Sequence, residues 1–271
     1  MNIMANFDIR RFGFVLRWMA VSMRKKVLTN AGAMFFAYMV VFVTNILLSL
    51  RTDKWYAFNK IVETVHTNAM VFMVIWVMGG CWIINNMKTK KLRVTFIMLP
   101  ASRLEKFVAR AFYVTFVWTV MAFVTYCLAD LFRMLMSFVM GVHVAGCTIP
   151  MFLSQIFDEH LIASSKWEDK LALVSCFALV LFTHSIYVLG GVIFRRWQFV
   201  FTSCFVFLLT IACMSLTSVL PISYLISGTA ENVRILAVAV CVFILWGATN
   251  WWLAYRLFRR MQVINNKWIN I

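Results

Sequence analysis

The sequence predicts an all-α integral membrane protein with six transmembrane helices and with both termini in the cytoplasm. Hydrophobic residues make up 63% of the 271 residues and charged residues only 13%, which leaves too little polar surface for a water-soluble fold of this length. Six uncharged apolar stretches are each long enough to cross the hydrocarbon core as a helix of about 20 residues. The charged residues, in turn, are sorted between alternate loops.

Nineteen of the 26 Lys and Arg residues, but only two of the ten acidic residues, lie in the segments 1–30, 87–110, 195–196 and 256–271. Short loops rich in Lys and Arg stay on the cytoplasmic side of a membrane, so this sorting predicts the orientation of a multi-pass protein of the inner (plasma) membrane. A net charge of +16 in a soluble chain would suggest nucleic acid. Here the basic residues flank apolar spans without a nucleic-acid motif, so we expect the lipid bilayer as partner and no nucleic acid.

Residues 1–30 are expected to form a basic amphipathic segment in the cytoplasmic interface. Phe7, Phe14 and Trp18 share one face of a helix, while Arg10 and Arg17 lie on others. The alternative is a basic tail that only follows the charge rule. The apolar run that follows is too long for the core of a signal peptide and lacks a clean cleavage site, so we expect it to be retained.

Residues 31–255 are expected to form a six-helix transmembrane domain, followed by a basic cytoplasmic tail over 256–271. The few glycines and prolines predict mostly unbroken helices. Aromatic residues gather at helix ends, as an interfacial belt requires. The expected spans are 31–50, 67–87, 111–129, 171–194, 197–220 and 235–255.

The cytoplasmic loop from Lys88 to Arg110 is the most structured polar segment of the sequence. Its basic start, which includes Arg93, leads into the apolar stretch 94–99 with Phe96 and Leu99, which is too short to span and too apolar for a solvated loop. We therefore expect something to cover that stretch. A break at Pro100 precedes a set of signals for a helix start.

Ser102 and Glu105 have the spacing of a capping box, in which each side chain bonds the backbone amide of the other residue. A helix is therefore expected to begin at Arg103 and to run without interruption into the third span. Beside a covered apolar stretch, this arrangement is where a soluble partner could dock.

Three polar residues within the spans form a possible intramembrane site, namely His184, Asn45 and Asn250. An ionisable group at membrane depth is a site hypothesis, but no carboxylate lies within the predicted spans to form a relay with His184. Hydrogen bonds between helices are the favoured role for all three residues. The seven Cys and four His show no metal-ligand spacing, so we expect no metal, no cofactor and no catalytic residue.

The stretch from Met98 to Arg110 resembles the "LPAS-x-LEKF" segment of membrane subunits in the type-two ABC exporter permease superfamily of Bacteroidetes-like bacteria. The six spans, cytoplasmic termini and basic N-terminal helix are similar in layout. The resemblance implies that the loop carries a coupling helix, at about Arg93 to Glu105, which receives motion from a cytoplasmic ATP-binding subunit. It also implies a second permease protomer, either identical or different.

The chain lacks the G-x-x-x-x-G-K-[ST] loop that cradles nucleotide phosphates, so the energy for export would come from a separate subunit and this chain would not be an enzyme. Two alternatives stay open. One is a membrane scaffold or accessory subunit without transport activity. The other is an ion-coupled secondary transporter, which the scarcity of intramembrane charge disfavours.

Overall fold

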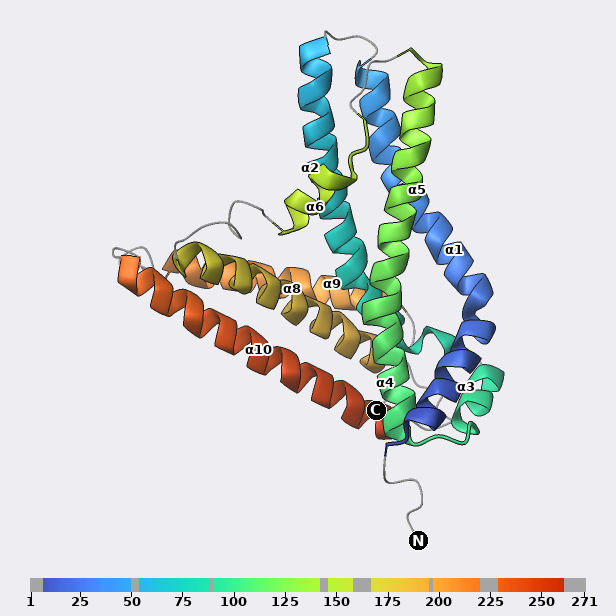
Figure 1. Cartoon of the computed structure of the whole chain (residues 1–271). Helices are drawn as coiled ribbons and strands as arrows, with labels where there is room; N and C mark the ends of the chain where they lie inside the picture. Colours follow the sequence, from blue (N-terminus) through green and yellow to red (C-terminus); the bar gives the residue numbers. More distant parts are fainter. Residues whose placement is uncertain are drawn as a thin grey trace. The chain divides into compact units, whose positions relative to one another are not determined.

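The computed structural model describes residues 7–49, 54–87, 90–141, 146–157, 167–194, 197–219 and 229–260. Within these ranges every regular element is a helix, as the sequence predicts (Figure 1). The elements in chain order are α1 (Ile9–Ser49), α2 (Lys54–Gly79), the 3₁₀ helix η1 (Gly80–Met87), α3 (Lys90–Ile97), α4 (Arg103–Phe112), the π-helical segment η2 (Tyr113–Val117), α5 (Trp118–Val139), α6 (Ile149–Phe157), α8 (Trp167–Ile193), α9 (Gln198–Val219) and α10 (Thr229–Arg260).

Five helical stretches in the described ranges are long and apolar enough to cross a membrane, which indicates a multi-pass membrane protein. A further stretch of α9, Gln198–Ala212, is apolar but shorter than a span. The sixth span and the orientation of the termini stay predictions. The five stretches are Ile9–Leu48, Lys60–Ile84, Arg103–Val139, Asp169–Ile193 and Val233–Arg260.

Helix α1 is continuous from Ile9 to Ser49, although the sequence suggested an interfacial segment that ends near residue 30 and a separate span after it. The only helix-weakening residues inside α1 are the isolated Gly13 and Gly32, and a single glycine costs a helix only about 1 kcal/mol. The boundary expected near residue 30 is therefore not a break in the backbone.

The chain divides into two units. Unit 1 comprises residues 1–21, 77–115 and 164–271, and unit 2 comprises residues 22–76 and 116–163. The chain passes from one unit to the other within α1, near the end of α2 and within η2. Each unit has its own core and is described separately.

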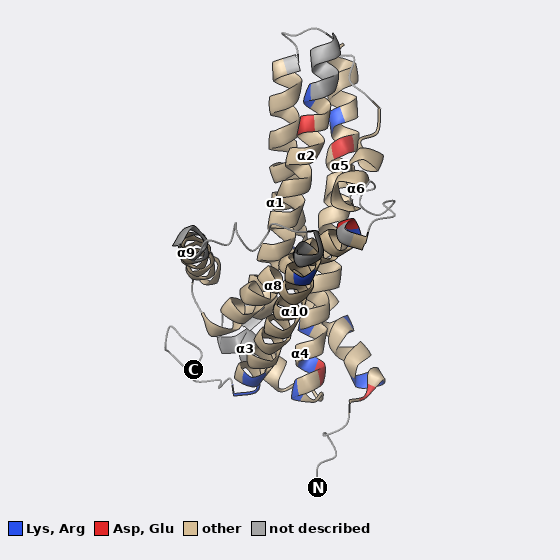
Figure 2. Cartoon of the chain, turned by 90° about the vertical axis from the view of Figure 1, so that its left-hand side faces the viewer, with Lys and Arg blue, Asp and Glu red and all other residues tan. Residues whose placement is uncertain are grey.

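In unit 1, α10 lies alongside α8, and both helices are uncharged except near their ends (Figure 2). Glycines allow the close approach of neighbouring segments to α8. A Cβ at Gly191 would lie 2.8 Å from the carbonyl oxygen of Cys81 in η1, and one at Gly80 would lie 2.8 Å from the backbone nitrogen of Val188. Small residues at contacts of this kind are typical of helix packing in membranes.

In unit 2, the aromatic core is built around Phe152 of α6, which is completely buried. The Phe152 ring stacks on Tyr126 of α5 with a centroid distance of 3.9 Å and meets Phe72 of α2 edge-on at 5.4 Å. Tyr38 of α1 contacts Tyr126 edge-on at 5.5 Å. The short α6 therefore supplies the ring that joins the longer helices of this unit.

The helix that begins at Arg103 continues through η2 into α5, so its start is confirmed, but the expected uninterrupted α-helix contains a π-helical segment. A π-helical segment inserts an extra residue into the α-helical ladder and is a common point of bending. In this chain it lies at the passage from unit 1 to unit 2.

Candidate functional site

The capping box predicted at the start of α4 is present. The Glu105 amide donates to Ser102 Oγ at 3.2 Å, and the Ser102 amide donates to Glu105 Oε2 at 2.8 Å. Glu105 makes two further contacts that the sequence did not indicate, because its Oε1 accepts from the Asp8 amide at 2.9 Å and pairs with Arg11 at 3.1 Å. Glu105 is completely buried, so one carboxylate both caps α4 and holds the start of α1.

Three cations on one face of α4 each donate to a backbone carbonyl of another helix. Arg103, Lys106 and Arg110 are spaced i, i+3 and i+7, which places them on the same side of the helix. Lys106 Nζ bonds its acceptor at 2.8 Å and Arg110 Nη1 bonds its acceptor at 2.6 Å. The acceptors are the carbonyls of Arg259 at the end of α10, Ile97 at the end of α3 and Ile83 in η1.

Carbonyls in the last turn of a helix lack intrahelical partners and carry the negative end of the helix dipole. Cations near such ends are favourable, and the bonds from Arg103 and Lys106 are of this kind. We call the three cations of α4 together with their three acceptors the α4 junction. It joins α4 to three segments of unit 1, of which η1 and α3 are near in the sequence and the end of α10 is 156 positions away.

The ring of Phe96 lies at the centre of the α4 junction. It is only 1% exposed, and it contacts the rings of Trp18 and Phe258 at centroid distances of 5.8 and 6.4 Å. The guanidinium of Arg110 lies over its face at 4.0 Å, and Lys106 Nζ lies at 5.9 Å. The apolar stretch is therefore covered at Phe96 by the chain itself, so Phe96 is not available to dock a partner in this conformation.

The other residues of the predicted coupling loop lie in or beside the turn between α3 and α4. Leu99 is half-buried and Pro100 is exposed. Arg93 belongs to α3, but its side chain lies outside the described residues. The exposed apolar side chains at this turn are Ile97, Met98 and Leu104, of which Met98 is the most open at 79% exposure.

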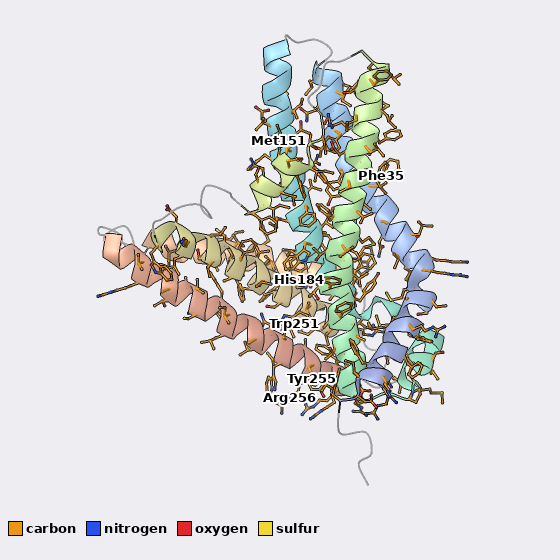
Figure 3. All side chains as sticks on the ribbon, in the orientation of Figure 1. Phe35, Met151, His184, Trp251, Tyr255 and Arg256 are labelled. Carbon is orange, nitrogen blue, oxygen red and sulfur yellow. The ribbon has the colours of Figure 1, made fainter. Side chains whose placement is uncertain are left out.

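Helix α4 also contacts the last turns of α10 through Phe107. Its ring lies 5.4 Å from the ring of Tyr255 and 5.5 Å from that of Phe258. Trp251, one turn earlier on α10, meets both Phe107 and His184 of α8 at 6.2 Å (Figure 3). His184 is 1% exposed, so it is a buried ring in the contact between α8 and α10.

The two predicted membrane asparagines differ in their bonds. Asn250 of α10 donates from Nδ2 to Ser185 Oγ of α8 at 3.0 Å, so it makes the bond between helices that the sequence favoured. Asn45 donates to the Val41 carbonyl of its own helix at 3.2 Å. Its hydrogen bond is therefore local, contrary to the expectation of a contact between helices.

A buried ion pair in unit 2 was missed at the sequence level. Arg133 Nε donates to Asp130 Oδ1 at 2.8 Å, and both side chains are almost fully buried. Asp130 also accepts from the amide and hydroxyl of Thr148, at 2.9 and 2.7 Å, and Arg133 donates to the Gly146 carbonyl. The signal was the D-x-x-R spacing directly after the predicted third span, which had been assigned to the outer loop.

Among the residues that the structure describes, no group of three or more His, Cys, Asp or Glu residues could hold a metal ion. No known family, curated protein or solved structure matches the chain. The α4 junction is therefore the best-defined candidate site, and what it does must be inferred from its own geometry.

Proposed function

We propose that the chain is the permease subunit of an ABC-type exporter of the inner membrane, with six spans and cytoplasmic termini, driven by a separate ATP-binding subunit. The observation that carries this proposal is that the turn between α3 and α4 has one face packed on the chain and one apolar face that is exposed. One side is held to the chain's own helices by the α4 junction and Phe96, while the other side exposes Ile97, Met98 and Leu104. A partner that moves could bind the apolar surface of this turn and transmit its motion, because the start of α4 is firmly bonded to the rest of unit 1.

The proposed mechanism is mechanical. Closure of the ATP-binding subunit would press on the exposed face at Met98, and the capping box would keep the first turn of α4 intact under that load. The bonds of the α4 junction would then carry the displacement to the ends of α3 and α10 and to η1. A second permease protomer would complete the path for the exported substrate.

The test compares Met98→Asp with Met98→Leu in native membranes. Met98→Asp should abolish co-purification of an ATP-binding subunit and the ATPase activity coupled to it, because a carboxylate would be desolvated at the contact. Met98→Leu keeps the apolar surface and should retain both. Since Met98 is 79% exposed, neither substitution should shift the midpoint of thermal unfolding by more than about 2 °C.

Phe96→Asp is a poor test of docking, because it would place a carboxylate in the core of unit 1 and should unfold that region whatever the partner does. Recovery of no nucleotide-binding partner with the wild-type chain would contradict the proposal. So would coupled ATPase activity that is unchanged in Met98→Asp.

An ion-coupled secondary transporter is the second candidate, and the observation that favours it is the buried Asp130–Arg133 pair. It lies within the long apolar stretch Arg103–Val139, so the absence of a carboxylate in the predicted spans no longer counts against this class. Uptake into proteoliposomes without any ATPase, driven by an ion gradient and lost in Asp130→Asn, would establish it. A scaffold would show neither activity.

A further inference from the structure

The buried guanidinium of Arg110 has two donor atoms, Nε and Nη2, without an acceptor among the described residues. Its side chain is 2% exposed, and its one hydrogen bond within the part of the chain that the structure describes runs from Nη1 to the Ile83 carbonyl. Among the described residues, its Nε and Nη2 meet no hydrogen-bond acceptor, and no carboxylate forms an ion pair with it. A buried cation in this condition is unusual, because buried charges in proteins are nearly always paired.

The two unused donors lie on the same edge of the guanidinium. The Nε–H and Nη2–H bonds point in nearly parallel directions, and this edge is the fork that binds the two oxygens of a carboxylate or phosphate. The third donor group holds the side chain to Ile83, and the ring of Phe96 lies 4.0 Å beneath its plane. The fork is therefore held in a fixed orientation, and the described residues supply no acceptor to it.

The acidic residue nearest in the sequence is already committed to other partners. Glu105 lies five residues before Arg110 and is bonded to the amides of Asp8 and Ser102 and to Arg11. It cannot also serve the Arg110 fork without breaking the cap of α4. Glu105 is therefore not the acceptor for this fork.

We propose that the Nε and Nη2 edge of Arg110 binds a phosphate group, supplied by a phospholipid headgroup or by free phosphate. Lys106, one turn earlier on α4, brings a second positive charge to the same ring of Phe96, and this suits phosphate better than a singly charged carboxylate. A basic membrane protein with a net charge of +16 also attracts anionic headgroups to its surface. Since both donor atoms are buried, a phosphate group can reach them only if neighbouring parts of the chain move.

The experiment measures thermal unfolding of the purified full chain in a sugar-based detergent that contains no phosphate. Probes are sodium phosphate, short-chain phosphatidylglycerol, diacylglycerol of the same chain length, and sodium acetate at matched ionic strength. At saturation, phosphate or phosphatidylglycerol should raise the unfolding midpoint by roughly 3 °C or more. Diacylglycerol and acetate should not. A shift with phosphatidylglycerol alone identifies a lipid headgroup, and an equal shift with inorganic phosphate identifies free phosphate.

Arg110→Lys keeps the charge but removes the fork, so it should lose the shift, whereas Arg17→Lys on the exposed surface of α1 should keep it. If Arg110→Lys does not fold, native mass spectrometry of the wild-type chain decides, because phosphatidylglycerol should stay bound at collision energies that remove diacylglycerol. No shift and no retained lipid would overturn the proposal. An undiminished shift in Arg110→Lys would overturn it too, and an equal response to acetate would point instead to a carboxylate of a protein partner.

Discussion

At the scale of single residues, the charged groups of α4 determine how the start of this helix is held. Glu105 receives two backbone amides and the guanidinium of Arg11 while it is excluded from solvent. Charge-assisted hydrogen bonds are about twice as strong as neutral ones, and a buried group that loses its partner costs more than the bond itself. The stability of the first turn of α4 and of its contact with the start of α1 should therefore depend on this one carboxylate.

Glu105→Gln should destabilise the chain by about 1–3 kcal/mol, because the amide loses the charge opposite Arg11 and one of its two acceptor atoms. The midpoint of thermal unfolding, followed by tryptophan fluorescence in detergent micelles, should fall by several degrees. Glu63→Gln is the matched control, since Glu63 pairs with Lys60 at the surface and is 65% exposed. Equal midpoints for the two variants would show that the buried contacts of Glu105 contribute nothing.

The sequence was informative at this scale where an interaction is local. The capping box depends on two residues three positions apart, so Ser102 and Glu105 could be assigned with their roles. The partners of Phe96 could not be found this way, because Trp18 and Phe258 come from opposite ends of the chain. Covering was expected for the whole apolar stretch, but the chain buries only Phe96 of it, and Ile97 and Met98 are exposed.

At the scale of helices, close backbone approach determines which segments can contact α8. Gly191 lies against the backbone of Cys81 and Gly80 lies against that of Val188, so a side chain at either glycine would force the two segments apart. The long uncharged apolar stretches predicted these helices but not their contacts. It also did not reveal the π-helical η2 or the continuity of α1, since both depend on how the rest of the chain packs.

Gly191→Ala should destabilise the chain by about 1–3 kcal/mol, because the new methyl group would lie under 3 Å from backbone atoms that cannot rotate away. Gly247→Ala in α10 is the matched control, since its nearest neighbour would be Ser185 Oγ at 3.8 Å, an ordinary contact distance. Thermal unfolding of both variants in the same detergent checks the difference. A Gly191→Ala variant as stable as Gly247→Ala would contradict the observed packing.

The hydrogen bond between Asn250 and Ser185 should contribute about 0.6 kcal/mol, the average for such bonds between membrane helices. A double-mutant cycle with Asn250→Ala and Ser185→Ala measures it as the coupling free energy of unfolding. Asn45→Ala is a useful comparison because the bond of Asn45 stays within its own helix. A coupling energy indistinguishable from zero would show that Asn250 and Ser185 do not interact.

At the scale of the whole molecule, the distribution of Lys and Arg between alternate loops predicts the orientation in the membrane. The number of spans then determines on which side of the membrane the C-terminus lies. The described residues include five candidate spans, and α9 is the element on which a sixth depends. An even number of crossings returns the C-terminus to the side of the N-terminus, whereas an odd number does not. The side of the membrane on which the last residues lie therefore shows whether α9 crosses the membrane.

A green fluorescent protein fused after Ile271 should fluoresce, and alkaline phosphatase fused at the same place should be inactive, because the six spans that we propose would leave Ile271 in the cytoplasm. The basic tail that begins at Arg256 predicts the same result. The opposite pair of readings, with the N-terminus shown independently to be inside, would mean that α9 does not cross the membrane.

The bond from Arg103 to the Arg259 carbonyl has a consequence for biosynthesis. The two residues are 156 positions apart, and Arg259 lies at the end of the last helix that the structure describes. During translation α4 leaves the ribosome long before its acceptor on α10 exists, so the junction can close only after α10 has been made. A chain cut short before α10 would also lack Tyr255 and Phe258, so the rings of Phe96 and Phe107 would lose their contacts with α10 in unfinished copies.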